Sequence, residues 1–255
     1  MHATAIVSTD ARLGDGVTAG PYAVIEPDVQ IGDRTEIRAH AVIKRFTSIG
    51  HDCVVHEGAV LGGEPQDVSF QPCQSYLRIG DRTIIREGVS IHRGTAAGST
   101  TRIGDDCFIM ANAHVAHDCL LGDHIVIANN VALAGHVSIQ SNAFLSGGVV
   151  VHQFCRIGRL AMIGGNAKII QDCLPFIVTD GVPGRASGLN TVGLKRSGIS
   201  RANLQALKNA YRILLRSQLP LEDALRRMQE MDNSLVNELI DFIRGSKRGF
   251  ARTQT

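Results

Sequence analysis

A repeat of six residues constrains the fold of this chain more than any other feature of its sequence. In runs of ten, three and twelve hexads between Val7 and Ile169, 24 of the 25 positions spaced six apart hold valine, isoleucine or leucine. The next position is often glycine, which tolerates the positive φ of a tight corner. Four places after the aliphatic position, the residue is small or β-branched. Each hexad therefore predicts a short strand followed by a corner.

Three hexads make one coil of a triangular parallel β-helix, a solenoid whose coils stack about 4.8 Å apart. The interior of such a prism is narrow, and the composition agrees with it. Aromatic residues make up 4% of the chain, tryptophan is absent and 27 residues are glycine. Five of the six cysteines fall at the small inward position, where a thiol acts as a small hydrophobe: Cys53, Cys107, Cys119, Cys155 and Cys173. We predict a mainly β fold of this kind with a C-terminal α-helical domain.

The repeat divides the chain into three parts. Hexads occupy residues 1–175, with departures near 62–78 and 95–102, and the prolines of the first favour a loop that leaves the coil. Residues 176–199 form a connecting segment with several glycines and prolines. In residues 200–255 the apolar spacing becomes helical after Ser200, a candidate N-cap, and we expect three helices there.

The charge is unevenly distributed. Residues 191–255 carry 12 Lys/Arg and 6 Asp/Glu, so their net charge is +6 within a total of +2, and the preceding residues carry −4. A basic tail suits an acidic partner. The small total gives no case for nucleic acid. No apolar run approaches the roughly 20 residues of a membrane span, and residues 1–4 show no secretory signal, so we expect a cytoplasmic chain without a disulfide framework.

The coil period brings polar residues together. Spacings of 18 residues predict that several of them share one edge of the prism: His117, Gly135 and Gln153 in one column, Asp118 and His136 in the next, with His114 and His152 beside them. An imidazole beside a carboxylate can act as a general base, and a glycine stacked over it can offer its N–H to a developing oxyanion. Three stacked histidines could instead bind zinc, as in the gamma-class carbonic anhydrases, which also use hexad β-helices.

Six stretches, in this order, resemble the UDP-N-acetylglucosamine acyltransferases of lipid A biosynthesis: a Gln66-Asp67 loop, IREGVSIHRGT (85–95), NAHVAHDC (112–119), LAGHVSI (133–139), VHQFCRIG (151–158) and NTVGLKRSG (190–198). The likeness covers essentially the whole chain. It implies a left-handed parallel β-helix assembled as a homotrimer, with active sites between subunits. The implied reaction, the first step of lipid A biosynthesis, moves an (R)-3-hydroxyacyl group from acyl carrier protein to the 3-hydroxyl of UDP-N-acetylglucosamine. The resemblance implies no metal and no tightly bound cofactor.

The same motifs imply roles for single residues. His117 resembles the general base, Asp118 the carboxylate that orients it, and Gly135 the donor to the oxyanion. Other residues resemble substrate-binding positions: His114, His136, His152 and Gln153 for the sugar nucleotide and acyl chain, Asp67 and His92 along the same cleft, Asn190 and Arg196 for the nucleotide, and Gly165 as the ruler of acyl-chain length.

The chain also departs from the family pattern. Val192 stands where a polar nucleotide contact is expected, and Ser69 and Phe70 replace residues of a more basic loop. A 3-amino analogue of the sugar therefore stays open as the acceptor. The related N-acyltransferases carry an N-terminal uridine-binding domain, whereas hexads begin here by Val7. A scaffold trimer without catalysis is the remaining alternative.

Overall fold

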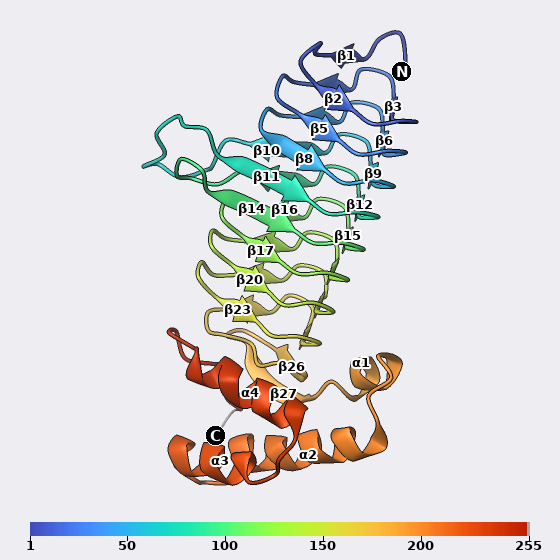
Figure 1. Cartoon of the computed structure of the whole chain (residues 1–255). Helices are drawn as coiled ribbons and strands as arrows, with labels where there is room; N and C mark the ends of the chain where they lie inside the picture. Colours follow the sequence, from blue (N-terminus) through green and yellow to red (C-terminus); the bar gives the residue numbers. More distant parts are fainter. Residues whose placement is uncertain (254–255) are drawn as a thin grey trace.

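Short strands stack into three parallel sheets in the computed structural model, which describes residues 1–253 (Figure 1). Sheet A holds β1 (Ile6–Val7), β4 (Val24–Ile25), β7 (Val42–Ile43), β10 (Val60–Gly63), β13 (Ser90–His92), β16 (His114–Val115), β19 (Ala132–Leu133), β22 (Val150–Val151) and β25 (Lys168–Ile169). Sheet B holds β2 (Arg12–Leu13), β5 (Gln30–Ile31), β8 (Thr47–Ile49), β11 (Tyr76–Ile79), β14 (Thr100–Ile103), β17 (Leu120–Leu121), β20 (Ser138–Ile139) and β23 (Arg156–Ile157).

Sheet C completes the prism with β3 (Thr18–Ala19), β6 (Glu36–Ile37), β9 (Val54–Val55), β12 (Ile84–Ile85), β15 (Phe108–Ile109), β18 (Val126–Ile127), β21 (Phe144–Leu145), β24 (Met162–Ile163), β26 (Ile177–Asp180) and β27 (Arg185–Leu189). The chain visits sheets A, B and C in turn, so the prism has an A/B edge, a B/C edge and a C/A edge. In Figure 1 the nearest strands, such as β14 and β17, run from left to right while the chain descends, so the solenoid is left-handed as expected.

The strand register confirms the 18-residue coil. In sheet B, Arg102 pairs with Leu120 and Leu120 with Ser138. The second residue of nearly every two-residue strand is the aliphatic hexad position, and from Ile25 to Ile169 these side chains are buried in one continuous core. The five cysteines predicted to face inward are buried there, and burial raises their thiol pKa values, to about 11 for Cys53 and about 12 for Cys119.

Two loops leave the prism from the A/B edge, where Figure 1 shows both projecting to the left. The long loop, residues 64–75, joins β10 to β11. The short loop, residues 93–99, joins β13 to β14. The long loop is shorter at both ends than the predicted span near 62–78, because β10 and β11 extend into that span. The short loop begins and ends a few residues earlier than the predicted span near 95–102, because β14 begins at Thr100. The pairing of Val60 with Ser90 and of Ser90 with His114 spans 30 and 24 residues, so the loops add whole multiples of six and preserve the hexad phase.

The connecting segment, predicted at 176–199, is ordered into regular structure. β26 pairs parallel with β24, and β27 returns antiparallel to it, so this hairpin extends sheet C. Helix α1 (Thr191–Arg196) follows. The hexad pattern gave no sign of these strands because they are four and five residues long and their burial alternates.

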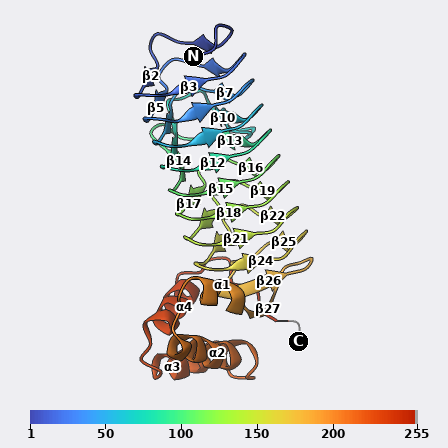
Figure 2. The ribbon, with the colours of Figure 1, turned by 90° about the vertical axis from the view of Figure 1, so that its right-hand side faces the viewer.

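The C-terminal helices pack against the last coils (Figure 2). They are α2 (Arg201–Leu215), α3 (Leu221–Gln229) and α4 (Ser234–Arg244), and Ser200 caps α2 as predicted, its side chain accepting from the Asn203 N–H. Their apolar faces form a second core with Leu174, Phe176 and Ile177. Within the described residues, no helix is both long and apolar enough to cross a membrane.

Candidate active site

His117 and Asp118 form a hydrogen-bonded pair at the A/B edge, in the corner between β16 and β17. The Nδ1 of His117 lies 3.0 Å from the Oδ2 of Asp118. Asp118 has a φ of 57°, a left-handed conformation that aspartate tolerates better than most residues. The corner therefore turns the carboxylate back onto the ring that precedes it. With Nδ1 as the donor, the Nε2 of His117 keeps a free lone pair.

Gly135 lies directly against the His117 ring, one coil further on. A Cβ atom built on Gly135 would lie 2.6 Å from Nε2, which leaves no room for a side chain. The backbone confirms the predicted ladder, since His136 N–H donates to the His117 carbonyl and Phe154 N–H donates to the Gly135 carbonyl. Among the described residues, no protein group accepts from the Gly135 N–H.

The short loop holds the Asp118 carboxylate from the other side. Oδ2 accepts from the Thr95 N–H at 3.1 Å and from the Thr95 hydroxyl at 2.7 Å. Burial would raise the pKa of Asp118, but the hydrogen bonds from Thr95 and His117 outweigh it, so the pKa lies below its ordinary value. Asp118 is therefore a carboxylate at neutral pH and can stabilise a charged His117.

Two further imidazoles lie beside the pair on the outer face of sheet A. The rings of His92 and His114 meet edge to face, with centroids 4.9 Å apart. Burial, followed by repulsion from His114 and His117, lowers the pKa of His92 to about 4. Burial and His117 likewise lower the pKa of His114, whose Nδ1 lies 2.8 Å from the hydroxyl of Ser90. Both rings are thus neutral at pH 7. The Nδ1 of His92 is buried and has no hydrogen-bond partner within residues 1–253.

His136 lies one coil beyond His117, and their ring centroids are 5.1 Å apart. Its other face stacks on Phe154 at 4.7 Å, and its Nε2 lies 3.8 Å from Asp118. One ligand atom from each of His117, Asp118 and His136 falls within 4.8 Å of the others, so this group can hold a metal ion. It is not the column of three histidines on which the zinc interpretation was based, and three donors from His117 and Thr95 already occupy Asp118 Oδ2.

The remaining predicted residues of this edge lie around the same cluster. His152 and Gln153 follow β22 and are exposed, and the His152 ring contacts the Gln153 carbonyl at 3.2 Å. Asp67 comes from the long loop, where it accepts from the backbone and the hydroxyl of Ser69. These hydrogen bonds lower the pKa of Asp67, and charges on His117 and His136 add to the effect. Ser69, a departure from the family pattern, thus fixes this carboxylate.

Three predicted residues do not join the cluster. Gly165 lies at the C/A edge, between β24 and β25. Asn190 caps α1: its Oδ1 accepts from the Gly193 N–H and its Nδ2 donates to the Leu160 carbonyl, so both ends of the amide are used within the chain. Arg196 is exposed in the last turn of α1, as is Val192 in the first. One protomer alone does not bring these residues to His117.

Sequence reasoning missed the residues that hold the imidazoles in place: Ser90, Thr95 and Phe154. Ser90 and Thr95 precede their partners by 24 and 23 residues, because the short loop lengthens that coil. The 18-residue spacing therefore did not reveal them. Phe154 does lie 18 residues after His136, and the same spacing would have found it.

Comparisons with known proteins agree with this geometry. The family described as UDP-N-acetylglucosamine O-acyltransferase, domain 2, matches residues 172–251, and the bacterial transferase hexapeptide family matches residues 10–45 and 100–135. The acyl-[acyl-carrier-protein]–UDP-N-acetylglucosamine O-acyltransferases of Myxococcus xanthus and Paracidovorax citrulli are 48% and 49% identical, each over 99% of both chains.

Solved structures give the same result. The UDP-N-acetylglucosamine acyltransferase of Bacteroides fragilis superimposes with a TM-score of 0.97 at 37% identity, over 99% of this chain and 100% of that one. The enzyme of Francisella novicida gives a TM-score of 0.95 at 35% identity, over 100% and 94% of the two chains. From the histidine cluster, the β-helix and these full-length relatives, we conclude that the chain belongs to the UDP-N-acetylglucosamine O-acyltransferase family.

Proposed function

We propose that the A/B edge transfers an (R)-3-hydroxyacyl group from acyl carrier protein to the 3-hydroxyl of UDP-N-acetylglucosamine, the first step of lipid A biosynthesis. One observation carries this proposal: His117 is held by Asp118 at Nδ1 while its Nε2 lies against Gly135. The names of the relatives supply the donor and the acceptor. Five of the six stretches that suggested the 3-hydroxyacyl group lie at this edge, and the sixth, residues 190–198, forms α1 and its ends.

The reaction begins with His117 as a general base. Its Nε2 takes the proton of the sugar hydroxyl while the oxygen attacks the thioester carbonyl of the donor. The carbonyl π electrons move to oxygen and give a tetrahedral oxyanion, to which the Gly135 N–H donates. Asp118 stabilises the imidazolium that has formed.

The intermediate then collapses. The carbonyl re-forms, the carbon–sulfur bond breaks, and the carrier thiol leaves with the proton that His117 held. The neutral state of His92 and His114 matters here, since two further cations beside His117 would make it a weaker base. Neutral rings can instead bind hydroxyl or carbonyl groups of the substrate.

We propose that the working assembly is a homotrimer with sites between subunits. The outer face of sheet C is apolar along five successive strands, which carry Ile84, Phe108, Val126, Phe144 and Met162. A second copy can cover this face. A neighbour could also bring Gly165, Asn190 or Arg196 to the His117 cluster, which a single protomer does not do.

Oligomeric mass tests this assembly. Phe144→Glu, which puts a charge on the apolar face, should reduce the mass measured by light scattering and abolish activity. Ser138→Glu, in the same coil but on sheet B, is the matched control and should stay assembled. A wild-type monomer that is fully active would overturn the proposal.

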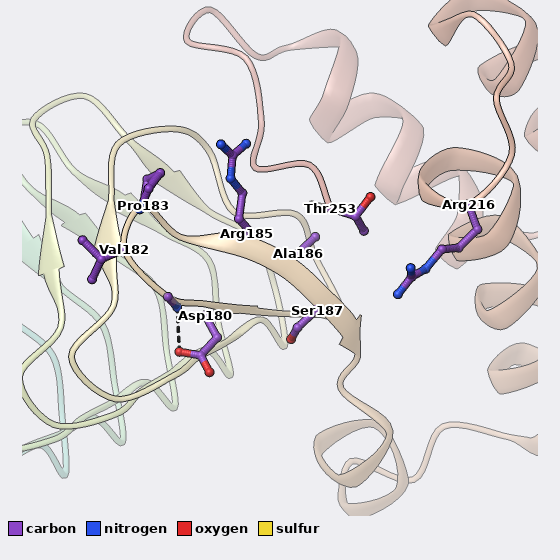
Figure 3. Close-up of a pocket in the computed structure, with 9 residues that line it drawn as sticks. Asp180, Val182, Pro183, Arg185, Ala186, Ser187, Arg216 and Thr253 are labelled. Atoms are coloured by element: carbon purple, nitrogen blue, oxygen red, sulfur yellow. Dashed lines mark hydrogen bonds between the residues drawn. The ribbon is translucent and has the colours of Figure 1, made fainter. Parts of the chain in front are cut away.

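The carrier protein is proposed to dock on the basic C-terminal helices. A hollow of about 580 Å³ lies between the β26–β27 hairpin and the end of α2, and its charged lining residues are Arg185, Arg216 and Asp180. Figure 3 shows Arg216 extending from the helical side toward the hairpin. Acyl carrier proteins are acidic, so two guanidinium groups at one hollow suit their surface.

Charge reversal tests this docking surface. Arg185→Glu with Arg216→Glu should raise the KM for the acyl carrier protein about tenfold and leave the KM for the sugar nucleotide unchanged. The effect should shrink at high salt. Arg12→Glu, on the first coils, is the control. Equal changes in both KM values would argue against docking here.

We also propose that the enzyme is cytoplasmic. All six cysteines are free, which suits a reducing compartment. A cytoplasmic enzyme would meet both proposed substrates there.

A panel of donors and acceptors tests the function. Purified protein is assayed with 3-hydroxyacyl and plain acyl carrier protein thioesters of several lengths, against UDP-N-acetylglucosamine and its 3-amino analogue. We expect 3-hydroxyacyl transfer to the 3-hydroxyl sugar. Faster transfer to the 3-amino analogue would show that the analogue is the preferred acceptor. Stoichiometric zinc required for activity would overturn the His117 mechanism.

A further inference from the structure

We propose that Arg93 is a positioning residue that clamps the long loop over the His117 cluster and so fixes Asp67 there; this rests on the proposed function. Arg93 follows His92 at the end of β13 and is only 5% exposed, unusual for an arginine. It does not touch the reacting atoms of the proposed mechanism. A buried guanidinium needs partners, and those partners show what it does.

Its hydrogen bonds reach both ends of the long loop. Nε donates to the Ser75 hydroxyl at 3.2 Å, and the guanidinium lies 3.4 Å from the carboxylate of Glu64. These are the last and the first residues of the loop. The Arg93 backbone N–H also donates to the Gly63 carbonyl, and the Ser75 hydroxyl donates to the Gly94 carbonyl. The Arg93 side chain therefore joins the two ends of a loop of twelve residues, in addition to the bonds made by the backbone of Arg93 and Gly94.

Aromatic rings extend the contact into the middle of the loop. The guanidinium carbon of Arg93 lies 5.6 Å from the centre of the Phe70 ring and 5.9 Å from that of Phe46 on the coil. A planar guanidinium packs on rings and forms hydrogen bonds at the same time, which an ammonium does less well. Phe70, the second departure in this loop, thus has a structural role as the ring that Arg93 contacts.

The loop held in this way carries Asp67. Its carboxylate is fixed locally by Ser69 and lies near enough to His117 and His136 for their charges to act on it. No helix or strand lies within residues 64–75. Loss of the clamp should therefore move Asp67 away from the cluster without disturbing the coil beneath.

Kinetics of Arg93→Met test the proposal. The KM for UDP-N-acetylglucosamine should rise about tenfold, since a positioning contact is lost, while kcat changes less than about twofold. Arg93→Lys should restore little, because it keeps the charge and loses the fork. Arg102→Met, an exposed arginine on sheet B, is the matched control. A fall in kcat with KM unchanged would overturn the proposal.

A double-mutant cycle separates positioning from general stability. If Arg93 acts through Asp67, adding Asp67→Asn to Arg93→Met should change KM by less than about twofold beyond the larger single effect. Full additivity would contradict the proposal.

Digestion tests the loop itself and needs no substrate. Chymotrypsin should cut after Phe70 at least tenfold faster in Arg93→Met than in the wild type, and equal rates would overturn the clamp. Should Arg93→Met fail to fold, the double variant Glu64→Ala with Ser75→Ala removes the same side-chain hydrogen bonds from the loop side, and both measurements are made on it. If chymotrypsin cuts Arg93→Met faster than the wild type, but the wild type shows no acyltransferase activity, the clamp is supported and only the proposed function is rejected.

Discussion

The A/B and B/C edges are built from the same corners, yet they use their polar residues differently. At the B/C edge, carboxylates bind within the ladder: Arg34 forms two hydrogen bonds to Asp52, and Arg82 forms two to Asp106. His51 contacts a carboxylate with each ring nitrogen. At the A/B edge, His117 binds Asp118 with one nitrogen only. Both edges contain a histidine beside a carboxylate, so the residue types do not distinguish them. The difference is that the Nε2 of His117 has no hydrogen bond within residues 1–253, whereas both ring nitrogens of His51 contact carboxylates.

The largest expected difference between the edges comes from removing one histidine from each. His117→Ala should lower kcat by about 10² or more, because the general base is lost. His51→Ala should leave kcat within about twofold. Steady-state rates with acyl carrier protein thioesters, at matched circular dichroism, give the comparison. A near-wild-type rate for His117→Ala would reject the role of this residue.

Glycines extend the comparison to the C/A edge. Gly135→Ala should lower kcat by about 10- to 100-fold, because its methyl group would push the His117 ring away from its place. Gly147→Ala should be nearly silent, since the nearest atom to its Cβ is a carbonyl oxygen 3.4 Å away. Both variants are measured for rate and thermal stability. Equal rates in the two would show that the A/B edge has no special steric demand.

Thr95→Val tests whether the hydrogen bonds to Asp118 matter. We expect kcat to fall about tenfold and stability to fall by about 1–2 kcal/mol, since the hydroxyl bond to a charged group is lost while the backbone N–H of residue 95 still donates. The pKa of folded Asp118 is lowered, so this stabilisation is present above the unfolded value of about 3.9 and is lost as the pH falls through the folded pKa. The gap in stability between wild type and variant should therefore close on acidification.

A gap that stayed constant from pH 7 to pH 2 would mean that Thr95 does not act through the charge of Asp118. Arg82→Met at the B/C edge is the control. It breaks an exposed ion pair and should change neither the rate nor, appreciably, the melting temperature.

Gly165→Met should have the smallest effect on rate and change selectivity instead. A Cβ at Gly165 meets nothing closer than 3.6 Å, so the position has room for a side chain. If a neighbouring subunit brings this edge to the acyl groove, the longer donors should lose several-fold in kcat/KM while the shorter ones do not. An unchanged chain-length profile would refute the ruler assignment.

The repeat itself was enough to predict the solenoid, its inward positions and the column of His117, Gly135 and Gln153, because a fixed period converts sequence spacing into spatial adjacency. It could not predict contacts across the two loops, where the period is interrupted; Thr95 and Arg93 belong to this group. The β26–β27 hairpin was missed for a related reason, since it joins sheet C without following the hexad.

The family resemblance, and not the repeat period, suggested the nucleotide-contacting residues. Asn190 and Arg196 were proposed from motifs alone, and the amide of Asn190 is engaged in capping α1. A contact between a nucleotide and this residue would have to share that amide or use its remaining lone pairs. Arg196, which is exposed, carries no such restriction.

The distribution of thiols has a practical consequence for observing this molecule. Five cysteines are buried, with pKa values raised by burial, and react slowly with alkylating reagents. Cys73 is half-buried in the long loop and its sulfur lies 3.5 Å from the Thr95 carbonyl of the short loop. A fluorophore attached under mild conditions would thus mark the seam between the two loops, and its emission would follow substrate entry in the otherwise unmodified chain.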